Sequence, residues 1–144
     1  MARILLVDDE PDMLALLSTL IRGRTGHQVL ATNNPLEVAE ILGREPVDAV
    51  VTDLKMPGMD GLELLAKVHA RDPDIAVLVI TAYGSEESAA EALKRGAVDF
   101  ITKPFRKEQI LLALDKALRF QALVRENREL RRQVEGRGGR TTDS

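Results

Sequence analysis

Five side chains with charged or hydroxyl groups stand at the ends of apolar segments that are far apart in the chain. In chain order they are Asp8, Asp9, Asp53, Thr81 and Lys103. Each one ends or follows a short apolar run of the kind that forms a buried strand. In a parallel sheet the carboxyl ends of the strands lie at one edge, where ligands bind in open α/β folds. We therefore expect these carboxylates, the hydroxyl and the ammonium to meet in one crevice.

The chemistry that fits this set is the transfer of a phosphoryl group to a carboxylate. Clustered carboxylates repel one another unless a cation joins them, and oxygen ligands with an open position suit Mg²⁺. Asp53 would attack the phosphorus, while Lys103 and Thr81 would hold the phosphoryl oxygens. Such a transfer depends on positioning and charge neutralisation, so the lack of a nearby histidine is no objection. Taken singly, Asp53 could instead cap the following turn, and Asp8 with Asp9 could be a solvated acidic helix start.

The segments that position these residues alternate between strand and helix patterns. The apolar runs expected to form strands are residues 3–7, 29–32, 49–52, 75–81 and 98–101. Amphipathic stretches separate these runs, with Pro, Asn-Pro or Ser at their starts and Gly or Asp-Pro near their ends. Five strands alternating with five helices predict an α/β fold, a doubly wound parallel sheet with helices on both faces.

The spacing of apolar residues predicts which side of each helix faces the sheet. The expected buried faces are Met13, Leu16, Leu17 and Leu20 in the first helix, Leu36, Ala39 and Leu42 in the second, and Leu62, Leu65 and Val68 in the third. The last helix begins near Arg106 and continues well beyond what a domain needs to cover its sheet.

The composition limits the classes of function. At 144 residues the chain suits one domain with an appendage. It has no cysteine, which excludes disulfides and thiolate sites, and no apolar run is long enough to cross a bilayer. Residues 1–118 carry 13 Lys and Arg against 19 Asp and Glu, whereas residues 119–144 carry 7 against 4. The acidic body does not favour direct nucleic acid binding, and we expect a cytoplasmic protein.

Four sequence motifs lie at the ends of predicted strands: ILLVDDE, VVTDLKMPGMDG, VITAYG and DFITKPF. In this order they resemble the motifs of the receiver domains of two-component response regulators. The resemblance covers roughly residues 1–120 and implies a flavodoxin-like strand order of 2-1-3-4-5. The expected organisation is a receiver domain at 1–118, a helical extension at 119–135 that could be a coiled-coil linker, and a disordered tail at 136–144.

The resemblance implies a role for each polar residue at the sheet edge. Asp53 would accept a phosphoryl group from the phosphohistidine of a sensor histidine kinase. Asp9 would bind Mg²⁺ directly and Asp8 would bind it through water. Asp53 and the main-chain carbonyl of Lys55 would be further ligands of the metal. Lys103 would pair with the phosphate.

The resemblance also implies how phosphorylation would change the domain. Thr81 would move to bond a phosphoryl oxygen, which lets the ring of Phe100 turn inward and alters the surface of the fourth helix, fifth strand and last helix. The family often has Tyr at this position, and Phe100 has no hydroxyl through which to signal; it could also be plain core filler. Lys55 and Tyr83 stand at the variable positions that influence hydrolysis of the aspartyl phosphate. The Lys103–Pro104 peptide bond is expected to be cis.

The predicted extension has a heptad pattern. Its a and d positions, which together we call the seam, are Phe120, Leu123, Asn127, Leu130 and Val134. The Asn at an a position, with Glu126 placed to face Arg131 of a second copy, favours a parallel homodimer. Two heptads alone are marginal, so the receiver surface should contribute to any dimer. The alternative is a solvated extension whose seam arises by chance.

Two other classes of function fit the sequence less well than a switch. The main alternative is an aspartate-nucleophile phosphohydrolase. Such an enzyme needs an acid two residues after the nucleophile to protonate the leaving group, where this chain has Lys55. A flavin carrier needs a Gly- and hydroxyl-rich phosphate loop and aromatic walls, but only 3% of the residues are aromatic. We therefore expect a regulatory protein and not an enzyme, apart from its own phosphorylation and slow dephosphorylation.

The stretch LVRENRELRRQ resembles the linker helix of nitrogen-regulation-type activators, in which a receiver precedes an AAA+ ATPase that drives transcription. This chain has no Walker motif. It would therefore be either the regulatory part of such an activator or a stand-alone receiver with a helical arm. In either case we expect it to regulate transcription through a downstream domain or partner.

Overall fold

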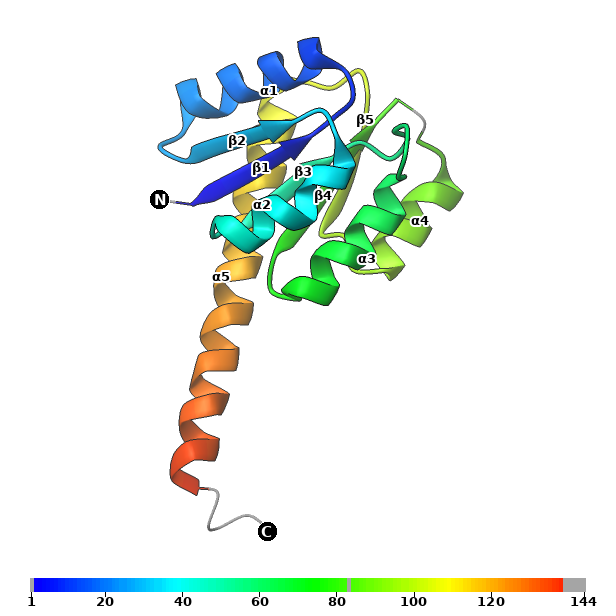
Figure 1. The fold of residues 1–144 in the computed structure, drawn as a ribbon. Coiled ribbons are helices and arrows are strands. Elements are labelled where there is room, and N and C mark those ends of the chain that lie inside the picture. The colour runs from blue at the N-terminus through cyan, green and yellow to red at the C-terminus, as the bar shows by residue number, and fades with distance from the viewer. Residues whose placement is uncertain (1, 83, 139–144) are drawn as a thin grey trace.

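The strands of the chain form one parallel sheet. The computed structural model describes residues 2–82 and 84–138. The strands are β1 (Arg3–Val7), β2 (Gln28–Thr32), β3 (Ala49–Thr52), β4 (Ala76–Thr81) and β5 (Asp99–Thr102). Their order is β2-β1-β3-β4-β5 with parallel pairing throughout, which confirms the predicted doubly wound, flavodoxin-like sheet (Figure 1).

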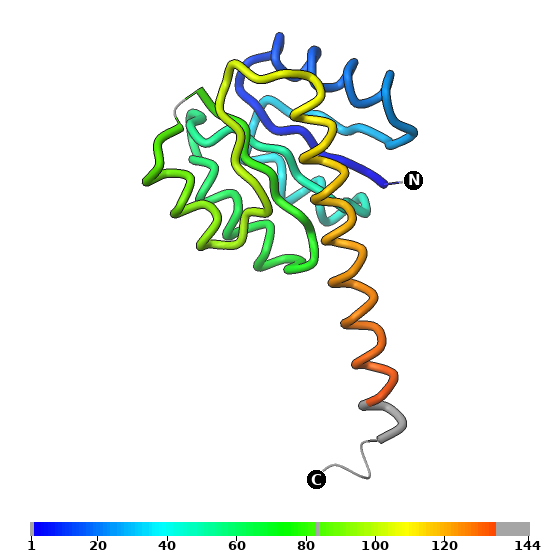
Figure 2. Tube along the Cα trace, turned by 180° about the vertical axis from the view of Figure 1, so that it is seen from behind, coloured from blue at the N-terminus to red at the C-terminus, as the bar shows by residue number. Residues whose placement is uncertain are grey.

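Helices cover both faces of this sheet (Figures 1 and 2). In chain order they are α1 (Pro11–Arg24), α2 (Val38–Arg44) preceded by the 3₁₀ turn η1 (Pro35–Glu37), α3 (Gly61–Arg71), α4 (Glu86–Lys94) and α5 (Lys107–Gly138). Helices α1 and α5 pack on one face, and α2, α3 and α4 pack on the other. Right-handed crossovers explain this division, because the chain steps outward from β1 to β2 and then returns to build the sheet in the opposite direction.

Successive residues of the strands point into two separate apolar cores. In β1, Ile4 and Leu6 join the core under α1 and α5, whereas Leu5 and Val7 join the core under α2, α3 and α4. Every residue of β4 is buried, as expected for a central parallel strand that is covered on both faces. The two cores therefore hold the carboxyl ends of the central strands in fixed positions.

Local capping signals start the helices that follow the two central loops. Asp60 and Glu63 form a capping box at the start of α3, in which the Asp60 side chain accepts a hydrogen bond from the Glu63 amide at 2.8 Å. The Ser85 hydroxyl accepts a hydrogen bond from the Ser88 amide at 3.0 Å at the start of α4. These caps define where the loops after β3 and β4 end.

The buried faces of α1 and α2 agree with the prediction only in part, since Leu17 and Leu20 are buried as predicted. Leu16 is 46% exposed and Leu36 is 60% exposed, and Ala39 is exposed as well. The buried residues are Leu17, Leu20 and Ile21 in α1, and Val38 and Ile41 in α2. The prediction for residues 35–42 assumed one α-helix, but η1 is wound more tightly than an α-helix and rotates the face that α2 turns to the sheet.

Helix α5 contains 32 residues and continues far beyond the sheet, as both views show (Figures 1 and 2). Its first part packs on the sheet through Ile110, Leu114 and Ala117. The predicted seam lies on its outer part and is exposed: Phe120 by 55%, Leu123 by 65%, Leu130 by 52% and Val134 by 59%, with Asn127 exposed as well.

The end of α5 corrects one predicted boundary. The helix includes residues 136–138, which were predicted to belong to a disordered tail. A single glycine costs a helix only about 1 kcal/mol, so Gly136 does not end it. Residues 139–144 of the predicted tail lie outside the described residues. None of the helices in the described part of the chain is long and apolar enough to cross a membrane.

Candidate functional site

The ends of β1 and β3 bring two buried carboxylates together. Asp8 follows β1 and is 3% exposed, and Asp53 follows β3 and is 4% exposed. The two strands are neighbours in the sheet, with Val7 paired to Thr52, so the residues that follow them are adjacent. The amide of Asp53 donates a hydrogen bond to the carbonyl of Val7 at 3.1 Å. The parallel register of the sheet therefore positions both acids.

Lys103 links these carboxylates from the end of β5. Its Nζ lies 3.1 Å from Asp53 Oδ2, 3.2 Å from Asp8 Oδ2 and 3.4 Å from Glu10 Oε1. The Lys103 side chain is only 10% exposed, and its amide donates a hydrogen bond to the carbonyl of Thr81 at 2.8 Å. The structure thus brings together three of the predicted site residues, Asp8, Asp53 and Lys103.

Burial and charge oppose each other in this cluster. Burial raises the pKa of Asp8 above its ordinary value, and a hydrogen bond from the Glu10 amide and the nearby Lys103 ammonium offset part of this rise. Burial by itself would lower the pKa of Lys103, but its hydrogen bonds and charge interactions with Asp53 and Asp8 raise that pKa above its ordinary value. Lys103 therefore remains protonated as the counter-charge of the buried carboxylates.

The loop after β3 fixes the orientation of the Asp53 carboxylate. Its Oδ1 accepts hydrogen bonds from the amides of Leu54 at 2.6 Å and Lys55 at 3.3 Å, while Oδ2 faces Lys103. Gly61, at the start of α3, returns against this loop and donates its amide to the Leu54 carbonyl at 2.6 Å. A Cβ at position 61 would lie 2.5 Å from the carbonyl oxygen of Asp53, so the approach requires glycine.

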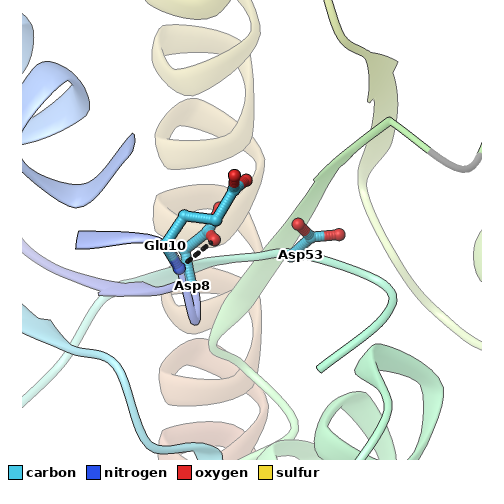
Figure 3. A group of neighbouring side chains, drawn as sticks. All are labelled: Asp8, Glu10 and Asp53. Atoms are coloured by element: carbon cyan, nitrogen blue, oxygen red, sulfur yellow. Dashed lines mark hydrogen bonds between the residues drawn. The ribbon is translucent and has the colours of Figure 1, made fainter. Parts of the chain in front are cut away.

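A solvent-open cavity of about 530 Å³ lies over the carboxylates. It is lined by Asp9, Glu10, Asp53, Lys55, Met56, Pro57 and Ala82. Carboxylate oxygens of Asp8, Glu10 and Asp53 lie within 4.8 Å of one another, a spacing that could hold a metal ion. Figure 3 shows Asp8 and Glu10 side by side, joined by the 2.9 Å hydrogen bond from the Glu10 amide, with Asp53 across from them. These donors are all oxygens, which is the ligand type that Mg²⁺ prefers.

The cluster differs in one acid from the predicted metal ligands. Asp9 is exposed and lines the cavity, and the acid that approaches Asp8 and Asp53 is Glu10. Sequence reasoning gave Glu10 no role, because three consecutive acids carry no local signal that ranks them. Lys55 is exposed and lines the cavity, and Tyr83 lies outside the described residues.

Thr81 and Phe100 lie on the neighbouring strands β4 and β5. Thr81 is fully buried at the end of β4, and the next residue, Ala82, lines the cavity. Phe100 is half-buried and packs on the core under α2, α3 and α4. The Lys103–Pro104 peptide bond is cis, as predicted. The movements of Thr81 and Phe100 on phosphorylation stay predictions.

Gly84 is a close neighbour of Phe100 that sequence reasoning missed. A Cβ at this position would clash with Thr102 Cγ2 and would lie 3.1 Å from Phe100 Cε1. The loop after β4 therefore approaches β5 closely because residue 84 has no side chain. The only local signal was the position of this glycine directly before the predicted helix cap, Ser85. That signal does not indicate which distant residue the glycine contacts.

Fold and site together define a class of protein. A buried aspartate beside a lysine ammonium, with an acidic cluster, lies at the carboxyl edge of a five-stranded parallel sheet, where doubly wound α/β domains bind their ligands. The response regulator receiver domain model matches residues 4–115, and the chain belongs to this family. Receiver domains of two-component systems act as regulatory switches and not as metabolic enzymes.

Curated relatives include both long regulators and a short receiver. The chain is 37% identical to the transcriptional regulatory protein GlrR of Escherichia coli over 127 residues, which are 88% of this chain and 28% of GlrR. It is 40% identical to the response regulator protein PilR of Pseudomonas aeruginosa, over 83% of this chain and 26% of PilR. It is 37% identical to the chemotaxis protein CheY of Listeria monocytogenes, over 81% of this chain and 98% of CheY. The chain thus spans about a quarter of the long regulators and nearly all of CheY.

Solved structures agree with this family and include longer proteins. The crystal structure of NtrX from Brucella abortus in complex with ADP matches with a TM-score of 0.83 and 32% identity, over 90% of this chain and 30% of NtrX. The solution structure of the beryllofluoride-activated NtrC4 receiver domain dimer matches with a TM-score of 0.79 and 31% identity, over 84% of this chain and 99% of that domain.

Proposed function

We propose that this chain is a phosphorylation-dependent switch in which Asp53 accepts the phosphoryl group. The observation that carries the proposal is the position of the Asp53 carboxylate, which lines the cavity and lies between two backbone amides and the ammonium of Lys103. Fixed hydrogen-bond donors and a fixed positive charge stabilise the negative charge of a phosphoryl group during transfer. Membership of the receiver family supports the same assignment.

The proposed donor is the phosphohistidine of a sensor histidine kinase. A carboxylate oxygen of Asp53 attacks the phosphorus as the phosphorus–nitrogen bond breaks, and the electron pair of that bond remains on the imidazole of the kinase. The product is an aspartyl phosphate, in which Lys103 pairs with a phosphoryl oxygen. The transfer needs no general acid from this chain, because the imidazole can take up a proton from water.

The residues around Asp53 also fit a Mg²⁺ ion. Asp8, Asp9, Asp53 and the main-chain carbonyl of Lys55 would hold it, with Glu10 close enough to join them. When bound, Mg²⁺ would supply further neutralisation of the charge on the phosphoryl oxygens. Lys55 occupies the place where a phosphohydrolase of this type would need an acid, which counts against hydrolysis as the main activity.

The proposed response begins at Thr81. Its hydroxyl moves toward the phosphoryl group, and the ring of Phe100 turns further into the space that Thr81 leaves. Both residues lie on neighbouring strands, so the change reaches the surface formed by α4, β5 and the first part of α5. Lys55 and Tyr83 are proposed to set the lifetime of the aspartyl phosphate.

The proposed output is a change in self-association that acts on transcription. We divide the chain into a receiver, residues 1–118, and a helical extension that begins at 119. The extension would pair with that of a second copy through the seam defined above, since those residues are exposed. A related receiver, that of NtrC4, forms a dimer when activated by beryllofluoride, and long relatives are transcriptional regulators, which supports an AAA+ output domain in a longer parent chain.

The acceptor is tested by intact mass after incubation with Mg²⁺ and a small phosphodonor. The wild type is expected to gain one phosphoryl group, and Asp53→Asn is expected to gain none. Asp12→Asn is the matched control, since Asp12 is an exposed acid in the first turn of α1 and should leave the gain intact. No gain in the wild type, or an undiminished gain in Asp53→Asn, would refute the assignment. Comparing Asp9→Asn with Glu10→Gln at several Mg²⁺ concentrations identifies which acid the metal needs.

The seam is tested by light scattering with and without beryllofluoride. Leu130→Ser should weaken self-association, because Leu130 is half-exposed at a d position of the seam. Leu112→Ser removes another exposed leucine of α5 that lies outside the seam and should leave a seam dimer intact. If Leu112→Ser weakens self-association and Leu130→Ser does not, the dimer interface lies on the receiver surface and not on the extension.

A further inference from the structure

Two arginines in the outer part of α5 form ion pairs with aspartates at the end of the sheet opposite the proposed phosphorylation site. Arg125 Nη1 lies 2.8 Å from Asp48 Oδ1, and Arg125 Nη2 lies 3.2 Å from Asp72 Oδ2. Arg128 Nη2 lies 3.1 Å from Asp74 Oδ1. We call these five residues the clasp. Figures 1 and 2 show α5 passing this end of the sheet before it leaves the body.

The receiver itself positions the aspartates of the clasp. The second carboxylate oxygen of Asp48 accepts a hydrogen bond from the Arg3 amide at 2.8 Å, and that of Asp72 accepts one from the Asp74 amide at 2.9 Å. Asp74 is only 8% exposed. A buried carboxylate is costly without a counter-charge, and among the described residues Arg128 supplies it. Backbone amides of the receiver thus hold the carboxylates of Asp48 and Asp72 where Arg125 meets them.

The clasp and the seam occupy different sides of the same helix. In the heptad that places Asn127 at a, Arg125 falls at f and Arg128 at b, on the side away from the a and d positions. Gln121, also at b, is 5% exposed and is packed against the body. Docking of this side on the receiver therefore leaves the seam turned outward.

Helical order in the outer part of α5 needs support from outside the helix. Short helices are marginal in water, and beyond Gln121 the described residues of α5 have no buried side chain. The ion pairs of Arg125 and Arg128 extend the attachment to the body by about two turns. The acidic body and basic tail noted in the sequence are in contact here.

We propose that the clasp pre-organises the helical arm in the monomer and presents the seam to a second copy of this chain. An arm that is already helical loses less conformational entropy when it pairs, so the clasp strengthens self-association without contacting the partner. The effect of the clasp on pairing rests on the proposed seam dimer. Its effect on the helical order of the arm is independent of any dimer.

Hydrogen exchange of the full chain tests the clasp at a concentration at which light scattering finds a monomer. The double variant Arg125→Gln with Arg128→Gln is expected to exchange the amides of residues 121–134 about tenfold faster than the wild type. The matched control is Arg119→Gln with Arg132→Gln, which removes two arginines paired to Asp115 and Glu129 within α5 itself. This control should change the same amides less than about twofold.

A second measurement uses the wild type alone and does not depend on the folding of a variant. Raising the NaCl concentration should accelerate exchange in residues 121–134 of the wild type toward the rate of the clasp variant, since salt screens partly exposed pairs. Amides of β4 should stay more protected than those of residues 121–134 in both proteins. Equal exchange in wild type and clasp variant, or equal acceleration in the control variant, would overturn the proposal.

Self-association is then measured on the same proteins. If the seam dimer forms, the clasp variant should raise its dissociation constant several-fold, and the control variant should leave it unchanged. A clasp variant whose arm exchanges faster while its dimer is undiminished would overturn the link to pairing. If no dimer forms at all, the proposed output fails, and the exchange result still decides whether the clasp orders the arm.

Discussion

A methyl group added at Gly61 tests how the loop after β3 holds Asp53. The Cβ would lie 2.5 Å from the Asp53 carbonyl oxygen and 2.9 Å from Leu54 Cα, both backbone atoms that cannot turn aside. Glycine to alanine in a helix normally stabilises by about 0.5–1 kcal/mol, whereas overpacking costs about 1–3 kcal/mol. With backbone on both sides the clash should dominate. We expect Gly61→Ala to lower the free energy of unfolding by about 1–2 kcal/mol, or Tm by about 3–8 °C.

The assay is urea unfolding followed by far-ultraviolet circular dichroism, because the chain has no tryptophan. Gly23→Ala in α1 is the matched control, since a Cβ there meets nothing within 4 Å, and it should raise stability by about 0.5–1 kcal/mol. Gly61→Ala should also slow phosphorylation, because the clash displaces the backbone of the acceptor. If Gly61→Ala unfolds at the same or a higher urea concentration than the wild type while Gly23→Ala behaves as expected, the steric argument is wrong.

Three further changes have expected outcomes in the same urea assay. Leu78→Ala in the fully buried centre of β4 should cost about 2–5 kcal/mol, and a loss under about 1 kcal/mol would mean that the sheet repacks. Asp60→Ala should cost about 1 kcal/mol by removing the cap of α3, whereas Asp60→Ser should recover most of that loss. Lys103→Met should cost about 1–3 kcal/mol, because it leaves the carboxylates of the site without their ammonium; added Mg²⁺ should restore stability, and no response to Mg²⁺ would argue against the metal site.

The sheet and the meeting of Asp8, Asp53 and Lys103 could be predicted because their signals are local. Each lies after an apolar run, and turn and cap residues mark where the runs end. Once the strands are parallel, geometry places their carboxyl ends at one edge. The order of the strands came from the resemblance to receiver domains and is confirmed by the structure.

Predictions that depended on helical phase were less accurate. A buried face predicted from spacing is correct only if the whole segment is one α-helix, and η1 broke that condition before α2. Leu36 was predicted to be buried and is 60% exposed. Likewise, the order of acids in the sequence could not decide that Glu10 approaches Asp8 and Asp53, because side-chain direction in a loop depends on the backbone around it.

The sequence by itself determined most of the strands and helices, their parallel arrangement and the meeting of Asp8, Asp53 and Lys103, since these follow from patterns that span a few residues. Only the tertiary structure decided the distant contacts that do not follow from strand ends meeting at one edge of the sheet. Arg125 and Asp48 are 77 residues apart, and their contact depends on the angle at which α5 crosses the sheet. The approach of Gly84 to Phe100 depends in the same way on the path of the loop after β4. Local propensity carries no information about such distances, because they arise when the packed cores fix the elements relative to one another.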